Sequence, residues 1–126
     1  MKKIITTKNA PAPIGPYNQA MLVNDTLYLS GQIGLDPRLM KMVTGDIKKE
    51  TEQVMKNLKN VLEAADMTFN HVIKSSIFLS DMEDFGEVNE VYGSYFLNET
   101  APARETVAVR TLPKHVRVEI SMIAVK

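Results

Sequence analysis

The chain has 126 residues, carries 15 Lys and Arg against 15 Asp and Glu, and contains two His and no Cys. This length fits one domain over residues 1–126, and the charge balance argues against a protein that binds nucleic acid by bulk attraction. Without cysteine the chain has no disulfide, no thiolate nucleophile and no cysteine-based metal site, and His71 and His115 match no metal spacing. We therefore predict no metal centre.

The N-terminal seven residues place two lysines before only two strongly apolar residues, so they do not form the apolar core of a secretory signal. No later run approaches the length of a membrane span. We expect a cytoplasmic protein without a membrane association. Residues 9–16 contain three prolines and a glycine, a composition that excludes a helix or a regular strand and favours an ordered loop.

Two strands are predicted after this loop, at residues 19–23 and 26–33, and a two-residue turn joins them in a hairpin. Residues 34–45 contain two glycines and a proline and are expected to form a loop. Asp46 suits the N-cap of a helix that runs to Ala65, because the apolar residues of this segment recur at helical spacing along one stripe.

The second half of the chain begins with a predicted buried strand at residues 72–79. Ser80 and Glu83 then have the spacing of a capping box, which predicts a second helix. Its apolar side chains share one side: Phe85, Val88, Tyr92 and Phe96. Gly86 and Gly93 lie on another face, and this stripe either marks a close approach of another backbone or is a neutral exposed surface.

Two strands close the chain, at residues 105–111 and 116–125, and the turn between them predicts a hairpin. Counting one further strand before the first helix, the element order is three strands, a helix, a strand, a helix and two strands. This order predicts an α+β fold in which two helices pack on one face of a mixed six-stranded sheet. The second face of the last strand is half apolar: Arg117, Glu119, Ser121, Ile123 and Val125. Such a face needs a cover, so we expect an oligomer.

Two charged residues stand out as chemical candidates. Arg104 follows a proline-stiffened loop at the start of a strand, where a guanidinium can hold a carboxylate by two parallel hydrogen bonds; the alternative is a surface arginine after a turn. Glu119 interrupts an apolar strand, and a partly desolvated carboxylate has a raised pKa and can act as a general acid or base on water. The alternative is a side chain that faces solvent or pairs with Arg117 or Arg110.

A hairpin register that sets Glu119 opposite Ala108 would leave Arg104 about 13 Å away along the neighbouring strand. That separation leaves room for a small acid and a water between the two side chains. The hypothesis requires both side chains on the same face of the sheet. Tyr17 and Ser30 stand beside glycines, and they either line a pocket or are satisfied loop and strand residues.

Five ordered segments of the chain together resemble the RidA (YjgF) family, at family spacing and over essentially the whole length. They are Pro-Ile-Gly-Pro-Tyr-Asn-Gln-Ala at residues 13–20, Leu-Ser-Gly-Gln-Ile at 29–33, the stretch 57–65 that begins Asn-Leu-Lys, Asn-Glu-Val-Tyr at 89–92 and Pro-Ala-Arg at 102–104. The resemblance implies a chorismate-mutase-like α+β fold and a homotrimer with three clefts between subunits.

The resemblance also implies an enzyme, a 2-iminobutanoate/2-iminopropanoate deaminase that needs no cofactor. Such enzymes hydrolyse the reactive enamine and imine acids, including 2-aminoacrylate, that pyridoxal-phosphate enzymes such as serine and threonine dehydratases release. The products are 2-oxo acids and ammonia. We therefore expect a small carboxylate imine or enamine as the substrate, and neither nucleic acid nor a membrane as a partner.

Site residues follow from the resemblance position by position. Arg104 matches the family's carboxylate-binding arginine, and Glu119 matches the glutamate that positions or activates water. Five further positions match the lining of the cleft: Tyr17, Ser30, Gly31, Phe85 and Asn89. Thr106 stands where the family often has Cys or Ser and is expected to contact substrate through its backbone, and Ser121 replaces a frequent acidic residue.

Two other functions stay open at this point. RNA binding or endoribonuclease activity with inhibition of translation is attributed to some relatives, but the sequence has no basic surface interleaved with aromatic residues. The other is a non-catalytic regulatory module that senses 2-oxo acids in the same clefts. The loss of imine in a dehydratase reaction distinguishes the enzyme from the module.

Overall fold

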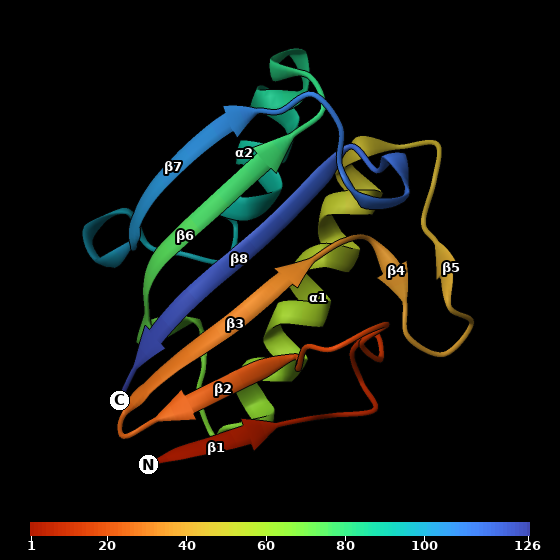
Figure 1. Ribbon diagram of the computed structural model, residues 1–126. Helices are drawn as coiled ribbons and strands as arrows, with labels where there is room; N and C mark the ends of the chain where they lie inside the picture. Colours follow the sequence, from red (N-terminus) through yellow and green to blue (C-terminus); the bar gives the residue numbers. More distant parts are fainter.

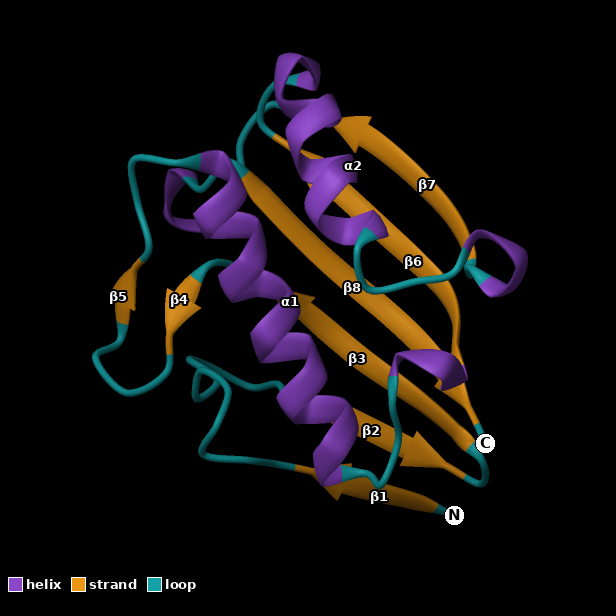
Figure 2. Ribbon diagram, turned by 180° about the vertical axis from the view of Figure 1, so that it is seen from behind, coloured by secondary structure: helices purple, strands orange, loops and turns teal.

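A six-stranded sheet, ordered β1-β2-β3-β8-β6-β7, forms the framework of the computed structural model, which describes all 126 residues (Figure 1). Its strands are β1 (Lys2–Ile5), β2 (Ala20–Val23), β3 (Thr26–Gln32), β6 (Val72–Leu79), β7 (Ala103–Ala108) and β8 (Val118–Val125). The helices α1 (Ile47–Ala64) and α2 (Phe85–Gly93) both lie across one face of this sheet (Figure 2). The predicted α+β fold, with two helices on a mixed six-stranded sheet, is confirmed.

Helix α1 begins and ends within a residue of the prediction. Asp46 caps it, because its carboxylate accepts a 2.8 Å hydrogen bond from the Lys48 backbone N–H. Four apolar side chains of its stripe are fully buried: Val54, Leu58, Val61 and Leu62. Burying each of them contributes roughly 1.5–3 kcal/mol relative to exposure, and this stripe ties α1 to the sheet. Neither helix has the length and apolarity that crossing a membrane requires.

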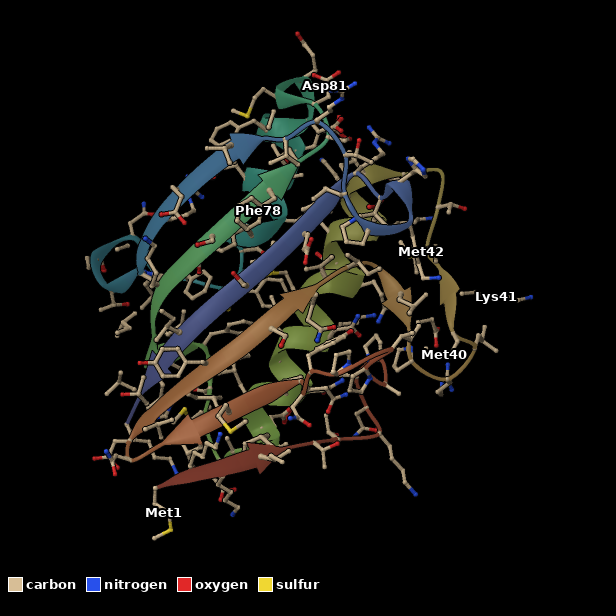
Figure 3. The ribbon with its side chains drawn as sticks, viewed as in Figure 1. Met1, Met40, Lys41, Met42, Phe78 and Asp81 are labelled. Carbon is tan, nitrogen blue, oxygen red and sulfur yellow. The ribbon has the colours of Figure 1, made fainter.

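The predicted hairpin near the N-terminus is confirmed, since β2 and β3 pair antiparallel with Val23 opposite Thr26. The segment after it differs from the prediction, because residues 34–45 contain a short hairpin of β4 (Leu35–Asp36) and β5 (Lys41–Met42). Figure 3 labels Met40, Lys41 and Met42 in this hairpin. Strands of two residues are too short to show a period in the sequence.

The start of α2 also differs from the prediction. Ser80 does not cap a helix; its backbone N–H donates to the Arg117 carbonyl oxygen at 3.1 Å and joins the end of β6 to the start of β8. Asp81 takes the capping role instead, accepting from the Glu83 N–H ahead of the 3₁₀ turn Met82–Asp84. An ionised carboxylate is a stronger acceptor than a hydroxyl. The predicted apolar side of α2 does pack on the core: Phe85, Val88, Tyr92 and Phe96.

The hairpin predicted for the last two strands is wrong. Strand β6 lies between them, pairing parallel with β7 and antiparallel with β8. The reason is the connection through α2, because a helix that links two neighbouring strands returns the chain to the same end of the sheet and makes them parallel. Phe78 of β6, not Ala108, therefore lies opposite Glu119.

The two faces of the sheet differ in their cover. The β8 side chains that face the helices are buried: Val118, Ile120, Met122 and Ala124. No helix crosses the other face (Figure 1), which carries the alternate residues of β8. Tyr28, opposite Ile123, also lies on this face. Phe78, opposite Glu119, lies there too and is labelled in Figure 3. Tyr28 is 50% exposed there, and Val107 at the β7 edge is 43% exposed. This open face is half apolar, as predicted, and a single chain leaves it uncovered.

Candidate active site

A pocket of about 650 Å³ lies where the end of β3 meets the proline-containing loop and the start of β8. Four predicted site residues line it: Tyr17, Ser30, Gly31 and Glu119. Ile14 and Ile33 form part of an apolar wall, and the 3₁₀ turn Pro113–His115 adds Lys114 at the rim. We call this the glutamate pocket, and it brings together one half of the predicted site.

The loop that carries Tyr17 is ordered by a buried glutamine that the sequence analysis did not single out. The Gln19 amide donates to the carbonyl oxygens of Ala10 and Pro11 at 3.1 and 2.9 Å, and its Oε1 accepts from the Thr7 N–H at 2.7 Å. Gln19 is only 2% exposed. A proline-rich loop lacks N–H donors for a regular ladder and depends on such a side chain. The prediction of an ordered loop is confirmed.

Ser30 holds the same loop from the strand side. Its Oγ donates to the Asn18 carbonyl oxygen at 2.6 Å, and its backbone N–H donates to the Gln19 carbonyl oxygen at 2.9 Å. Both alternatives weighed for Ser30 are therefore true, since the residue lines the pocket and its hydroxyl is satisfied. The adjacent Tyr17 is 51% exposed at the pocket wall.

Glu119 is half-buried in the glutamate pocket and has no ionic partner. Its closest neighbour is Gly31, where an added Cβ would overlap the Glu119 Oε2, so only glycine permits this approach. Burial raises the pKa of Glu119 above its ordinary value. The predicted alternative, a pair with an arginine, is wrong for Arg117, because that guanidinium binds Asp84 at 2.6 Å. No cation therefore neutralises this carboxylate.

Arg104 lies in a second pocket, of about 340 Å³, which we call the arginine pocket. Its Nη1 donates to the Asn89 Oδ1 at 2.6 Å, and its Cζ lies 5.7 Å from the Phe85 ring centroid and 5.2 Å from that of Tyr92. All three partners come from α2 or the turn at its start. A guanidinium held in this way, with further N–H donors unpaired, suits a carboxylate ligand.

The arginine and glutamate pockets lie on opposite faces of the sheet. Arg104 is opposite the fully buried Ser75 and points to the helix side, whereas Glu119 alternates with buried β8 residues and points to the open face. The hypothesis of one cleft between Arg104 and Glu119 within a single hairpin is therefore wrong. Its physical reason is the misassigned strand pairing, since the two strands are not neighbours.

The structure also places Thr106 and the two glycines of α2. Thr106 lies on the same face of β7 as Arg104, and its Oγ1 is buried without a hydrogen-bond partner. A Cβ added at Gly86 or Gly93 would meet nothing within 4 Å, so no backbone of the same chain approaches that stripe. No three His, Asp or Glu side chains are arranged to hold a metal ion.

Sequence reasoning missed the environment of Arg104. Tyr92 was predicted only as an apolar core residue, yet it also stacks on the guanidinium and donates from its hydroxyl to the Ser75 Oγ at 2.9 Å. The available signal was Ser75 in a strand that was predicted to be buried, because a buried hydroxyl needs a partner. Lys114, at the rim of the glutamate pocket, has φ 56°, a conformation that no sequence pattern indicated.

The fold and the two pockets define an α+β protein that presents an arginine in one pocket and a glutamate in another, on opposite faces of its sheet. The family model described as Endoribonuclease L-PSP matches residues 7–126. The chain therefore belongs to this family, the RidA (YjgF) family.

Individual relatives agree with this placement. A 2-iminobutanoate/2-iminopropanoate deaminase from Mus musculus is 48% identical over 126 residues, which are 100% of this chain and 93% of the relative. The crystal structure of RidA from an Antarctic Psychrobacter is 43% identical with a TM-score of 0.93, covering 98% of this chain and 99% of that one. The structure of E. coli TdcF with bound serine is 37% identical with a TM-score of 0.92, covering 98% of each chain.

Proposed function

We propose that the protein hydrolyses 2-imino acids, such as 2-iminopropanoate and 2-iminobutanoate, to 2-oxo acids and ammonia. The observation that carries this proposal is the arginine pocket, where Arg104 is held by Asn89 and two rings while further donors stay free for a carboxylate. The half-buried Glu119 supplies a proton acceptor. Two relatives, 48% and 43% identical to this chain over 126 residues, carry the name of this deaminase.

The proposed reaction uses only these side chains and water. Arg104 holds the substrate carboxylate by two N–H···O bonds, and Glu119 takes a proton from water as the water oxygen attacks C2. The substrate is the protonated imine, so its C=N π electrons move to nitrogen and leave a neutral tetrahedral carbinolamine. Glu119 then returns its proton to nitrogen, and the C–N bond breaks to release ammonia. The hydroxyl gives its proton to Glu119 as it becomes the new carbonyl, and Glu119 passes that proton to solvent. General acid–base help of this kind contributes roughly 10²–10⁴-fold.

This mechanism needs a site shared between subunits, because the sheet separates Arg104 from Glu119 within one chain. We propose that the glutamate pocket of one subunit faces the arginine pocket of its neighbour, in a homotrimer with three such clefts. Two features support this arrangement: the half-apolar open face, and strand β7, in which five of the six residues are exposed. Tyr17, Ser30 and Gly31 would then line one wall, with Phe85, Asn89 and the Thr106 backbone on the other.

A coupled assay tests the proposal. The protein is added to a threonine or serine dehydratase reaction, and the decay of the imine is followed directly. We expect faster decay with the wild-type chain and a return to the uncatalysed rate with Arg104→Ala, while the variant keeps its oligomeric state. A folded wild-type protein that binds 2-oxobutanoate without speeding imine loss would favour the sensing module. RNA cleavage that survives Arg104→Ala would favour the nuclease.

A further inference from the structure

Three contacts to the Arg104 guanidinium come from one side of α2 and its start. Phe85, Asn89 and Tyr92 are spaced four and three residues apart, so their side chains stack along one helical face. Asn89 takes one N–H donor, and the two rings lie at 5.7 and 5.2 Å from the guanidinium carbon. Both separations are within the range in which an aromatic face attracts a cation.

Of these three contacts, Tyr92 alone is anchored to the strand next to Arg104. Its hydroxyl donates to the Ser75 Oγ at 2.9 Å, and both residues are buried, at 4% and 0% exposure. Ser75 is the residue of β6 directly opposite Arg104 in the parallel β6–β7 pairing. Burial raises the pKa of Tyr92, so the hydroxyl keeps its proton and stays a donor. The Tyr92 ring is therefore held through Ser75, the residue that lies directly opposite Arg104 in the sheet.

We propose that Tyr92, anchored by Ser75, is a positioning residue that fixes the plane of the Arg104 guanidinium for a carboxylate ligand. The inference rests on the proposed function, because it assigns a role in the same arginine pocket. A guanidinium binds a carboxylate best when two N–H groups in one plane meet both oxygens. A ring that fixes this plane before binding lowers the entropy that binding must overcome.

Tyr92→Leu removes the aromatic face and is the main test. We expect KM for 2-iminopropanoate, and Kd for the product analogue 2-oxobutanoate, to rise on the order of tenfold. We expect kcat to change by less than about twofold, because a carboxylate clamp acts equally on bound substrate and transition state. Unchanged KM and Kd in a folded Tyr92→Leu protein would overturn the proposal.

Two milder variants separate the ring from its anchor and keep the test valid if Tyr92→Leu does not fold. Tyr92→Phe and Ser75→Ala remove the same hydrogen bond from opposite ends while retaining the ring. We expect equal rises in KM of about two- to threefold for each, and no further rise when the two changes are combined. A loss for Tyr92→Phe as large as for Tyr92→Leu would overturn the role of the ring, and additive effects would overturn the anchor.

Tyr95→Leu is the matched control. The Tyr95 ring packs against Phe69, which packs against Phe96, and Phe96 in turn packs against Tyr92. The Tyr95 hydroxyl is bonded to Glu52, and the ring does not contact Arg104. Its truncation removes a tyrosine ring of similar size, so it reports on general destabilisation. We expect KM and kcat to stay at wild-type values.

A spectroscopic readout tests positioning without turnover. The chain has four arginines, and Arg104 alone lies over aromatic rings, so its Nε–Hε NMR resonance carries a ring-current shift. We expect the full shift in the wild type and in Tyr95→Leu, and a reduced shift in Tyr92→Leu, where only the Phe85 ring remains. An unmoved resonance in Tyr92→Leu would contradict the inference. If the wild type fails to hydrolyse imines, the proposed function is lost, while the NMR shift and the 2-oxobutanoate Kd still decide this inference.

Discussion

Burial of Glu119 has two opposing effects, one on its chemistry and one on the stability of the fold. Burial in the glutamate pocket raises its pKa, which suits a group that accepts a proton from water. The same burial disfavours the ionised carboxylate, and no cation compensates for it, since Arg117 is bound to Asp84. Its environment therefore suits the proposed catalytic role and is costly for the fold, a combination typical of active sites.

Replacing Glu119 with Gln should stop proton transfer and lower kcat by roughly 10²–10⁴-fold. In the wild type, activity should fall as the pH decreases through the raised pKa of Glu119, so the acid limb of the pH–rate profile should lie above the ordinary value of 4.5. Rates measured across the acidic range check both statements. An acid limb at or below the ordinary value would contradict the assignment of Glu119 as the base.

Glu119→Gln should lower activity, but it should not lower the stability of the fold. Because the pKa of Glu119 is raised in the folded state, its ionisation destabilises the fold above that pKa and has no effect below the pKa of the unfolded chain. Glu119→Gln should therefore have an equal or higher urea midpoint at pH 7 and converge with wild type in acid. Glu105→Gln is the control: Lys74 lowers the pKa of Glu105, so its loss should destabilise slightly at pH 7.

The sequence indicated the two charged candidates, Arg104 and Glu119, but it did not indicate their surroundings. Arg104 and Glu119 stand out in the sequence because a charge beside a proline-stiffened loop and a charge inside an apolar strand are both unusual. Which face each side chain points to depends on pairing between strands far apart in the chain. The role of Tyr92 under Arg104 depends in addition on how α2 is rotated over the β6–β7 pair, which no local pattern reports.

At the level of elements, Arg117 joins the start of β8 to both helices. Its guanidinium donates twice to Asp84, at 3.1 and 2.6 Å, just ahead of α2, and its backbone N–H donates to the buried Glu50 of α1 at 2.9 Å. Glu119 follows two residues later on the same strand. This junction holds the strand that carries the proposed base against the ends of both helices.

Asp84→Ala should lower the free energy of unfolding by about 1–2 kcal/mol, because it removes a two-bond charged contact whose arginine side chain is still 44% exposed. Glu90→Ala is the matched control, since its pair with Lys48 is more exposed and should cost less than about 0.5 kcal/mol. Urea denaturation of the two variants at equal m-value checks the difference. Equal losses would contradict the special role of the Arg117 junction.

The elements themselves were largely predictable, and their pairing was not. Helix α1 shows an aspartate cap and a regular apolar stripe, both local signals, and the N-terminal hairpin shows two short strands around a tight turn. The partner of β7 is not a local property, because α2 carries the chain over the sheet before β7 forms. A short turn after β7 suggested a hairpin, yet residues 109–117 pass the end of β6 instead, with Val109 bonded to Leu79.

In the whole molecule, the proposed homotrimer would account for both the uncovered sheet face and the separation of Arg104 from Glu119. The open face exposes apolar groups such as Tyr28 and Val107, and the outer edge of β7 is exposed along its length. A neighbouring subunit that covers this surface removes apolar area from water. The same contact can bring a second chain's arginine pocket to the glutamate pocket, so a cover for the sheet also completes the proposed site.

Mixing two inactive variants tests this shared site. Arg104→Ala and Glu119→Gln should each be inactive alone, but in randomly mixed trimers each cleft draws its arginine from one subunit and its glutamate from the next. Both groups are intact in about a quarter of clefts, so an equal mixture should recover about a quarter of wild-type activity. Subunit exchange is confirmed by native mass spectrometry, and imine loss is then measured.

The control for this mixture is a double variant that carries both Arg104→Ala and Glu119→Gln. Mixed with Arg104→Ala, it supplies no intact arginine to any cleft and should recover nothing, although it exchanges in the same way. Activity in this control would indicate residual function in one variant and not complementation. An exchanged mixture of the two single variants that stays inactive would contradict a shared cleft, because no cleft within one chain joins Arg104 to Glu119 across the sheet.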